Sequence, residues 1–296
     1  MSQFLQYLLS GVTVGSIYAI VAIGFNLIYS TTGILNFAQG EFVMLGGMTA
    51  VTLSAFMPLP VALVLSVAVV VVFGALLELL FFRHLRRPTP LQMLIITVGL
   101  AIVIREVAVH VWDEQPHRLA FFSGDECSSV AIFGAAISPQ VFWVLGTLCL
   151  SVVLLHLFLH HTLTGRAMRA CASNPEAAML AGIDVRRLRT LAFMISAGLG
   201  ALGGAVIAPI TSAQYDQGTG LAIKGFAAAI LGGFGAPAAA VPAGLLVGLA
   251  EALSVGVGLP AAYKDAAAFA LLVMVLILRP HGLFANRGHA SLEERV

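Results

Sequence analysis

Long apolar stretches alternate with short polar ones along the whole chain. The first charged residue is Glu41 and the next is Glu78, so the first quarter of the sequence carries very little charge. An α-helix needs about 20 apolar residues to cross a bilayer, and several stretches reach that length. The pattern predicts membrane-spanning segments at residues 7–29, 42–56, 59–82, 91–112, 139–159, 189–210, 221–234, 237–257 and 262–278.

The segment at residues 221–234 differs from the others. As a helix it would be only about 20 Å long, at about 1.5 Å per residue. Glycines lie at both of its ends, at positions 218 and 220 and at positions 232, 233 and 235. We therefore expect an all-α integral membrane protein, a polytopic helical bundle of about eight or nine spans, with this segment broken or re-entrant. We expect a single transmembrane domain over residues 1–296.

The composition excludes an ordinary water-soluble fold. Hydrophobic residues make up 59% of the chain and charged residues 10%, whereas a soluble domain has roughly a quarter of charged residues. The segment at 7–29 is too long for the apolar region of a signal peptide, and no positive charge precedes it, so we expect it to remain as a span. The net charge of +1 comes from scattered residues, which gives no basic surface for nucleic acid. The three cysteines have no spacing that would suit a metal ion.

The distribution of basic residues predicts the orientation in the membrane. Arginines fall in two short loops and in the C-terminal tail, at Arg83, Arg86 and Arg87, at Arg166, Arg169, Arg186 and Arg187, and at Arg279, Arg287 and Arg295. The positive-inside rule assigns all three places to the cytoplasm. The loop at residues 113–138 holds four acidic residues and one arginine and is predicted to lie outside. The N-terminus is then outside and the C-terminus inside.

The predicted cytoplasmic loop at residues 160–189 contains signals for a short helix. Asn174 is a favourable N-cap, Pro175 suits the first helical position, and Glu176 is favourable at the positive end of the helix dipole. Gly182 suits the position after the last turn. These signals predict a helix at residues 175–181, and Asp184 then caps the helix that enters the membrane. So short a helix needs a surface to pack against.

The same loop resembles a known family. Glu176, Ala177 and Ala178, followed after three residues by Gly182, match the core of the cytoplasmic EAA loop of ABC-importer permeases. The wider sequence resembles the high-affinity branched-chain amino acid permeases of the first-subunit type. The resemblance covers nearly the whole chain in order, through residues 11–19, 34–41, 229–233, 250–253 and 263–265.

The resemblance implies a complex of several proteins in the bacterial inner membrane. This chain would pair with a second, similar permease, two ATPases would bind on the cytoplasmic side, and an external solute-binding protein would deliver the solute. The chain contains no Walker A sequence, so we expect no cofactor in it and expect ATP and Mg²⁺ to be used by the ATPases. We expect no catalysis by this chain and no metal site.

Two groups of residues are candidates for function. The resemblance assigns coupling to the ATPase to Gly165, Arg169, Pro175, Glu176, Ala177, Ala178, Gly182, Ile183 and Asp184. Candidates for the translocation pathway lie inside or next to predicted spans, namely Asn26, Asn36, Phe37, Gln39, Glu41, Gly232, Gly233 and Glu251.

Structural roles compete with function at the membrane-embedded ionisable residues. Glu41 can stabilise the start of its own span, and Glu78 can reach the inner interface near Arg83. Lys224 is expected to extend toward the outer interface. Glu251 is open between an interhelical hydrogen bond and the pathway.

Other functions also remain open at the level of the sequence. A secondary transporter would use broken helices and carboxylates such as Glu41 or Glu251 to couple an ion. A membrane-embedded enzyme lacks a visible catalytic cluster. Within the importer class, the solute can be an aliphatic amino acid, urea, a short amide or an aromatic acid.

Overall fold

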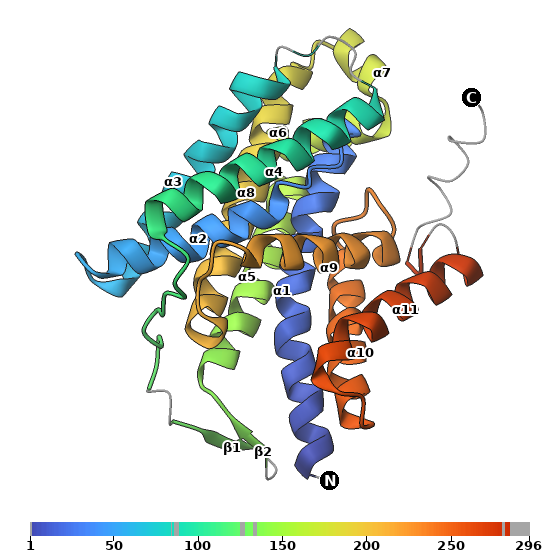
Figure 1. Ribbon diagram of the computed structural model, residues 1–296. Coiled ribbons are helices and arrows are strands. Elements are labelled where there is room, and N and C mark those ends of the chain that lie inside the picture. The colour runs from blue at the N-terminus through green and yellow to red at the C-terminus, as the bar shows by residue number, and fades with distance from the viewer. Residues whose placement is uncertain are drawn as a thin grey trace.

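The computed structural model describes residues 2–83, 85, 89–124, 128–132, 135–279 and 282–284. This part of the chain is mostly helical (Figure 1). The helices are α1 (Ser2–Thr32), α2 (Gln39–Ser54), α3 (Leu59–Leu77) with the π-helical turn η1 (Glu78–Phe82), α4 (Pro90–Trp112), α5 (Gln140–His161), α6 (Leu163–Ser173), α7 (Pro175–Leu180), α8 (Val185–Thr211), α9 (Gln217–Gly232), α10 (Ala240–Gly256), the 3₁₀ turn η2 (Ala261–Tyr263) and α11 (Lys264–Leu278). The prediction of an all-α membrane bundle is confirmed.

The predicted outer loop contains a small antiparallel β-hairpin. It consists of β1 (Val130–Ile132) and β2 (Ala135–Ile137), with Val130 opposite Ile137. The predicted outer loop contains Asp125, Glu126 and Cys127, and these lie outside the described residues, as do Arg86, Arg87, Arg287 and Arg295 of the predicted cytoplasmic segments.

Six helices of the described chain are long and apolar enough to cross a membrane. They are Gln3–Thr32, Leu59–Phe82, Leu91–Trp112, Gln140–His161, Val185–Thr211 and Ala261–Leu278. The predicted segments at 42–56, 221–234 and 237–257 correspond to α2, α9 and α10, which have only 16, 16 and 17 residues. The count of eight or nine spans therefore stays a prediction.

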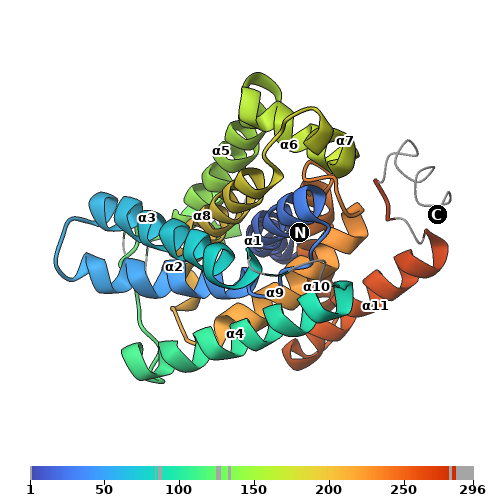
Figure 2. The same cartoon turned by 90° about the horizontal axis from the view of Figure 1, so that it is seen from above.

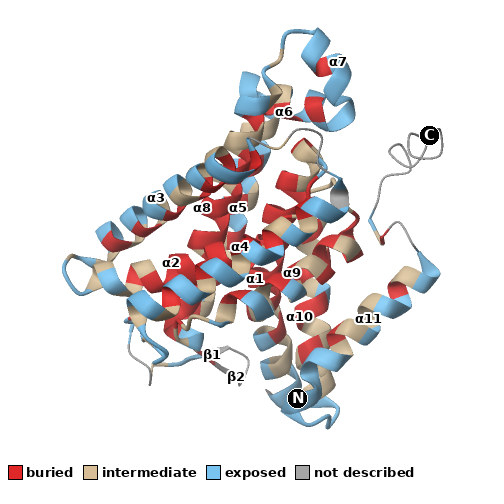
Figure 3. Cartoon of the chain, turned by 45° about the horizontal axis from the view of Figure 1, so that its top comes forward, coloured by how far each residue is buried: buried red, intermediate tan, exposed pale blue. Residues whose placement is uncertain are grey.

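Two helices form the centre of the bundle. In the most apolar 18-residue stretch of each helix, 72% of the residues of α1 and 78% of those of α8 are buried inside the molecule. The corresponding share is 22% for α3, α4 and α5 and 11% for α11. Figures 2 and 3 show α1 and α8 surrounded by the other helices, with the buried residues gathered around them. The outer helices expose Val and Leu side chains, as expected where a protein faces lipid tails.

Close approach of backbones holds these helices together. Gly11 and Gly15 of α1 lie against Gly248 and Gly244 of α10, and a Cβ at Gly15 would be 2.9 Å from the Gly244 carbonyl oxygen. Small residues spaced four apart allow such packing between membrane helices. These glycines, which are spaced four apart in each helix, therefore serve a contact within this chain.

Helix α9 lies across the bundle. In Figure 1 it runs crosswise to α1, and in the view from above it is seen along its length while α1 is seen nearly end-on (Figure 2). It begins at Gln217, four residues before the predicted segment, and ends at Gly232, where Gly233 adopts a φ of 96°. Helix α7 lies at one end of the molecule, and the hairpin and the start of α1 lie at the other (Figure 1).

Candidate functional site

Both ends of α7 have the caps that the sequence predicts. The Asn174 side chain accepts a hydrogen bond from the Ala177 amide at 2.9 Å. At the other end Gly182 has a φ of 82°, and the Ile183 amide donates to the Ala178 carbonyl at 3.0 Å. This is the Schellman arrangement, which favours glycine because a Cβ is strained at positive φ. The helix ends at Leu180, one residue earlier than predicted.

One face of α7 is buried and another is exposed. Ala178 is buried and belongs to the same apolar core as Met168 and Cys171 of α6. Met179 is 55% exposed and Leu180 is 91% exposed. Helix α7 itself lies at one end of the molecule (Figure 3). A capped helix that shows apolar side chains to solvent is suited to bind another protein.

The remaining predicted coupling residues lie in α6, in α7 and in the short link after α7. Gly165 is buried where α6 turns back on α5, and a Cβ there would clash with the Phe158 carbonyl. The side chains of Arg169, Glu176 and Ala177 are exposed. The segment from 160 to 189 thus forms one compact unit, held by the caps of α6 and α7.

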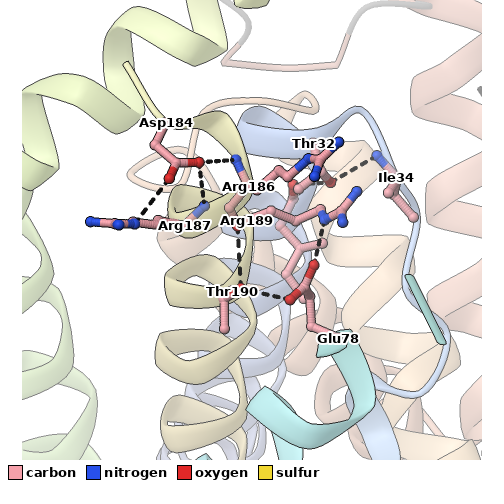
Figure 4. A network of polar contacts seen from close by, with 9 residues as sticks. Thr32, Ile34, Glu78, Asp184, Arg186, Arg187, Arg189 and Thr190 are labelled. Carbon is pink, nitrogen blue, oxygen red and sulfur yellow. Dashed lines mark hydrogen bonds and ion pairs between the residues drawn. The ribbon is translucent and has the colours of Figure 1, made fainter. Parts of the chain in front are cut away.

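Asp184 fixes the start of α8. Its carboxylate accepts hydrogen bonds from the amides of Arg186 and Arg187 at 3.1 and 3.2 Å and forms an ion pair with the Arg187 side chain at 2.9 Å (Figure 4). The predicted N-cap is confirmed. Because only Ala181, Gly182 and Ile183 separate α7 from this cap, the two helices are tightly joined.

Glu78 connects the start of α8 to α3. Its carboxylate, which is 0% exposed, accepts from Arg189 Nε and from the Thr190 hydroxyl, each at 2.6 Å (Figure 4). Glu78 thus has a structural role, with Arg189 and Thr190 as its partners, and its place at the inner interface stays a prediction. The pairing joins residues more than a hundred positions apart, and no local pattern indicates it.

The contact between α3 and α8 continues on both sides of this ion pair. The Phe82 and Phe193 rings pack at 5.0 Å between centroids, and Gly74 lies close to Ala197. Glu78 and Phe82 are the two ends of the π-helical turn η1. Single π-helical turns within α-helices occur frequently at functional sites.

Gln39 joins three helices at the centre of the bundle. Its amide nitrogen donates to the Ser196 carbonyl of α8 at 3.1 Å, and the Ser196 hydroxyl lies 2.5 Å from the Gln39 side-chain oxygen and 2.9 Å from the Gly24 carbonyl of α1. All of these groups are buried. The network connects α1, α2 and α8.

Glu41 lies in the first turn of α2 and is almost completely buried. One carboxylate oxygen accepts from the Thr219 hydroxyl of α9 at 3.5 Å, and Thr219 in turn accepts from Arg105 of α4 at 3.2 Å. The other oxygen has no hydrogen-bond partner. An acidic group in this state is exceptional inside a helical bundle.

Five aromatic rings form a cluster beside the two predicted pathway asparagines. We call it the aromatic cluster, and it consists of Phe25, Tyr29, Phe37, Phe226 and Phe234, with centroid separations of 4.8 to 6.1 Å. Asn26 accepts from the Gly235 amide, and Asn36 accepts from the Ala38 amide. The side-chain amide nitrogen of each asparagine is buried without a partner.

The two predicted pathway glycines form the end of α9. A Cβ at Gly232 would be 2.7 Å from the Ala239 carbonyl oxygen, and the Gly233 amide is close to Gly282. Their geometry serves a tight turn into α10.

Glu251 belongs to a separate charged network. It accepts from Tyr18 at 2.7 Å and from Lys224 at 3.0 Å, and it forms an ion pair with Lys264 at 3.5 Å. Lys224 also forms an ion pair with Asp265 at 2.7 Å. Lys224 thus pairs with two carboxylates, one buried and one half exposed. Its expected course toward the outer interface stays a prediction.

The predicted pathway residues thus form several groups. Asn36 to Glu41 lie between α1, α8 and α9, whereas Glu251 lies with Tyr18 and Lys224 on another side of α9. Sequence reasoning missed the roles of Tyr18, Lys224 and Ser196. A lysine near the middle of an apolar helix was the available signal for this network.

Comparison with known proteins identifies the family. Residues 7–276 match the family model described as "Branched-chain amino acid transport system / permease component". The chain belongs to this family. BraD of Pseudomonas aeruginosa, a high-affinity branched-chain amino acid transport system permease protein, is 34% identical over 96% of both chains. LivH of Escherichia coli K12, described in the same words, is 32% identical over 96% of both chains. The ribose import permease protein RbsC of E. coli K12 is 27% identical over 74% of this chain and 66% of its own length.

Proposed function

We propose that this chain is the permease subunit of an ABC importer that carries branched-chain, aliphatic amino acids across the bacterial cytoplasmic membrane. Membership of the permease family supports the transport role. The names of the relatives that match almost end to end support the solute class.

The proposed complex contains four further subunits. A second homologous permease pairs with this chain in the bilayer, two ATPases bind at the cytoplasmic end, and an external solute-binding protein delivers the amino acid. ATP and Mg²⁺ act in the ATPases, and this chain contributes no catalytic group. The N-terminus lies outside and the C-terminus inside.

One observation carries the coupling proposal, namely the exposed apolar end of α7. Leu180 is 91% exposed on a helix whose two ends are capped and whose Ala178 is buried. Exposed large apolar groups on an otherwise polar segment are typical of protein interfaces. In the proposed assembly α7 inserts into a groove on the ATPase.

The joined helices provide a route for movement from α7 into the membrane. Residues 181–183 link α7 to Asp184, which caps the first turn of α8. Arg189 and Thr190 connect that turn to α3 through Glu78. Ser196, two turns further along α8, couples it to α1 and α2. Closure of the ATPases would therefore move α1, α2, α3 and α8 together.

The proposed translocation pathway uses the polar residues around α1 and α9. The unpaired side-chain nitrogens of Asn26 and Asn36 and the unpaired oxygen of Glu41 support this assignment. Unsatisfied polar groups are costly in an apolar interior, and they are found where function requires them.

Two matched variants test the docking of α7. Leu180→Asp places a charge on the proposed interface, whereas Leu163→Asp places one on α6, where Leu163 is 78% exposed. Both variants are expected to fold, because neither side chain is buried. Co-purification with the ATPases should be lost for Leu180→Asp and retained for Leu163→Asp, and leucine uptake should follow. Equal co-purification of both variants would contradict the docking role.

A further inference from the structure

Four charged side chains and a tyrosine from four helices meet inside this permease. We call them the outer charge cluster, and they are Tyr18 of α1, Lys224 of α9, Glu251 of α10 and Lys264 and Asp265 of α11. The two lysines and the two carboxylates give no net charge if all four are ionised. The Lys224 ammonium lies 5.4 Å from the centre of the Tyr18 ring and so also gains a cation–π contact.

The outer charge cluster leads from the surface into the bundle. Asp265 is 52% exposed and Lys264 is about half exposed, while Glu251 is only 5% exposed and Tyr18 is buried. Gly256, the last residue of α10, packs against Tyr7 near the start of α1. Tyr18 lies about 16 Å further along α1, at about 1.5 Å per residue. The cluster therefore begins near the end of the molecule that is predicted to face outside.

A purely structural role explains this arrangement poorly. Charges taken out of water lose solvation energy that an ion pair recovers only in part, and apolar replacements are often as stable or more stable. The cost is larger within a membrane, where ionisable residues by default indicate function. Here Lys224 and Glu251, which form an ion pair, lie on two helices that are otherwise almost entirely apolar.

The chemistry of the cluster matches that of a free amino acid. An amino acid at neutral pH carries one ammonium and one carboxylate, the same two groups that the cluster holds. Its ammonium can replace a lysine at Glu251 or Asp265, while its carboxylate accepts from the lysine that is released. The number of positive and negative charges then stays balanced. A solute with a single charge would leave one buried group unpaired, which is costly.

The aromatic cluster lies next along the same helices. Phe226 follows Lys224 by two residues in α9, and Phe25 follows Tyr18 by two turns in α1, with 5.8 Å between the two ring centroids. These rings offer an apolar surface to an aliphatic side chain, beyond the charges that would hold the backbone groups of the amino acid.

We propose that the outer charge cluster is an exchange site for zwitterionic amino acids entering the permease. This proposal rests on the proposed function, since it assumes that amino acids are the transported solutes. The solute is held by ion pairs in place of those within the cluster, and the original pairs form again when it moves inward.

The test uses the complete importer in proteoliposomes, with its second permease, ATPases and binding protein. Uptake of radiolabelled L-leucine is measured for the wild type, for the neutral double variant Lys224→Met with Glu251→Gln, and for Asp265→Asn. Glu106→Gln is the control, because Glu106 is an exposed carboxylate on α4. Co-purification of all subunits and the thermal midpoint show whether each complex is intact.

The expected result is an intact double variant with leucine uptake lowered at least about tenfold, the effect of losing one charged hydrogen bond. Asp265→Asn should also lower uptake, and Glu106→Gln should not. A merely structural ion pair predicts uptake close to that of the wild type by the intact double variant, because the two buried charges are removed together and only the half-exposed Lys264 and Asp265 lose a partner. Wild-type uptake by the double variant would overturn the proposal.

If the double variant does not assemble, the uptake of Asp265→Asn tests the proposal, because this half-exposed residue can be changed without a large cost in folding. Normal uptake by Asp265→Asn would then overturn the proposal, and reduced uptake by an intact complex would support it. If the wild-type importer with ATP takes up no leucine, the proposed function itself is wrong, which is a distinct result.

Discussion

The Arg189 guanidinium lies 2.6 Å from the Glu78 carboxylate and so ties the first turn of α8 to the π-helical end of α3. Glu78 is fully enclosed, whereas the Arg189 side chain keeps 19% of its surface exposed. The two partners therefore depend on the ion pair to different degrees. This asymmetry gives a prediction for each partner.

Arg189→Met should destabilise the protein more than Glu78→Gln. The first change leaves a buried carboxylate with Thr190 as its remaining partner, a loss of about 3–5 kcal/mol. The second removes the charge from the buried site, and Arg189 can turn toward water, so we expect a loss of about 1.5–3 kcal/mol. Thermal unfolding in detergent measures both. The double variant should be more stable than Arg189→Met alone, and equal midpoints for the two single variants would contradict this account.

Two neighbouring glycines of α8 should respond differently to alanine. A Cβ at Gly204 would overlap the Val43 carbonyl of α2, which is backbone and cannot move alone. A Cβ at Gly203 would be 3.3 Å from a methyl group of Ile20, which can adjust. We expect Gly204→Ala to cost about 1–3 kcal/mol, as overpacking usually does, and Gly203→Ala to be nearly neutral. A nearly neutral Gly204→Ala would show that α2 and α8 are not in close contact at this position.

Gly182 should tolerate asparagine better than valine. Its φ of 82° disfavours residues with a Cβ by about 1–2 kcal/mol, and most strongly the β-branched ones. Gly182→Val is therefore expected to displace the chain after α7 and to lower both ATPase co-purification and uptake, while Gly182→Asn keeps much of both. Insertion in the membrane should be normal for each variant. Full coupling by Gly182→Val would remove the role assigned to this turn.

Cysteine labelling should establish the orientation of the chain. In a variant without native cysteines, Met179→Cys should react with a membrane-impermeant maleimide only from the cytoplasmic side, and Gln115→Cys only from outside. Replacing Cys171 is a precaution of small importance, because burial raises the pKa of its thiol and so lowers its reactivity at neutral pH. Labelling of both positions from one side would overturn the predicted topology.

Local signals made the cytoplasmic segment predictable from the sequence. The caps at Asn174, Gly182 and Asp184 each involve residues within five positions, so residue type and spacing were sufficient. The apolar runs likewise predicted every helix longer than 18 residues, because length and composition decide whether a helix can span a bilayer.

Contacts between distant helices could not be predicted in this way. Glu78 and Lys224 were assigned to the interfaces because snorkelling depends only on position along a helix. Their real partners, Arg189 for one and Glu251 and Asp265 for the other, depend on how the helices pack. Helix α2 begins at Gln39, three residues before the predicted segment, and Glu41 lies in its first turn, where the helix dipole favours its charge.

The most direct test of the transport proposal is the energy source for leucine uptake by the reconstituted importer. Proteoliposomes that enclose ATP and contain no ion gradient should accumulate radiolabelled leucine when the loaded binding protein is added outside. Proteoliposomes with a proton or sodium gradient but without ATP should accumulate none. Accumulation driven by the gradient alone would contradict the account and would instead indicate a secondary transporter, in which Glu41, with its unpaired carboxylate oxygen, is the first residue to test.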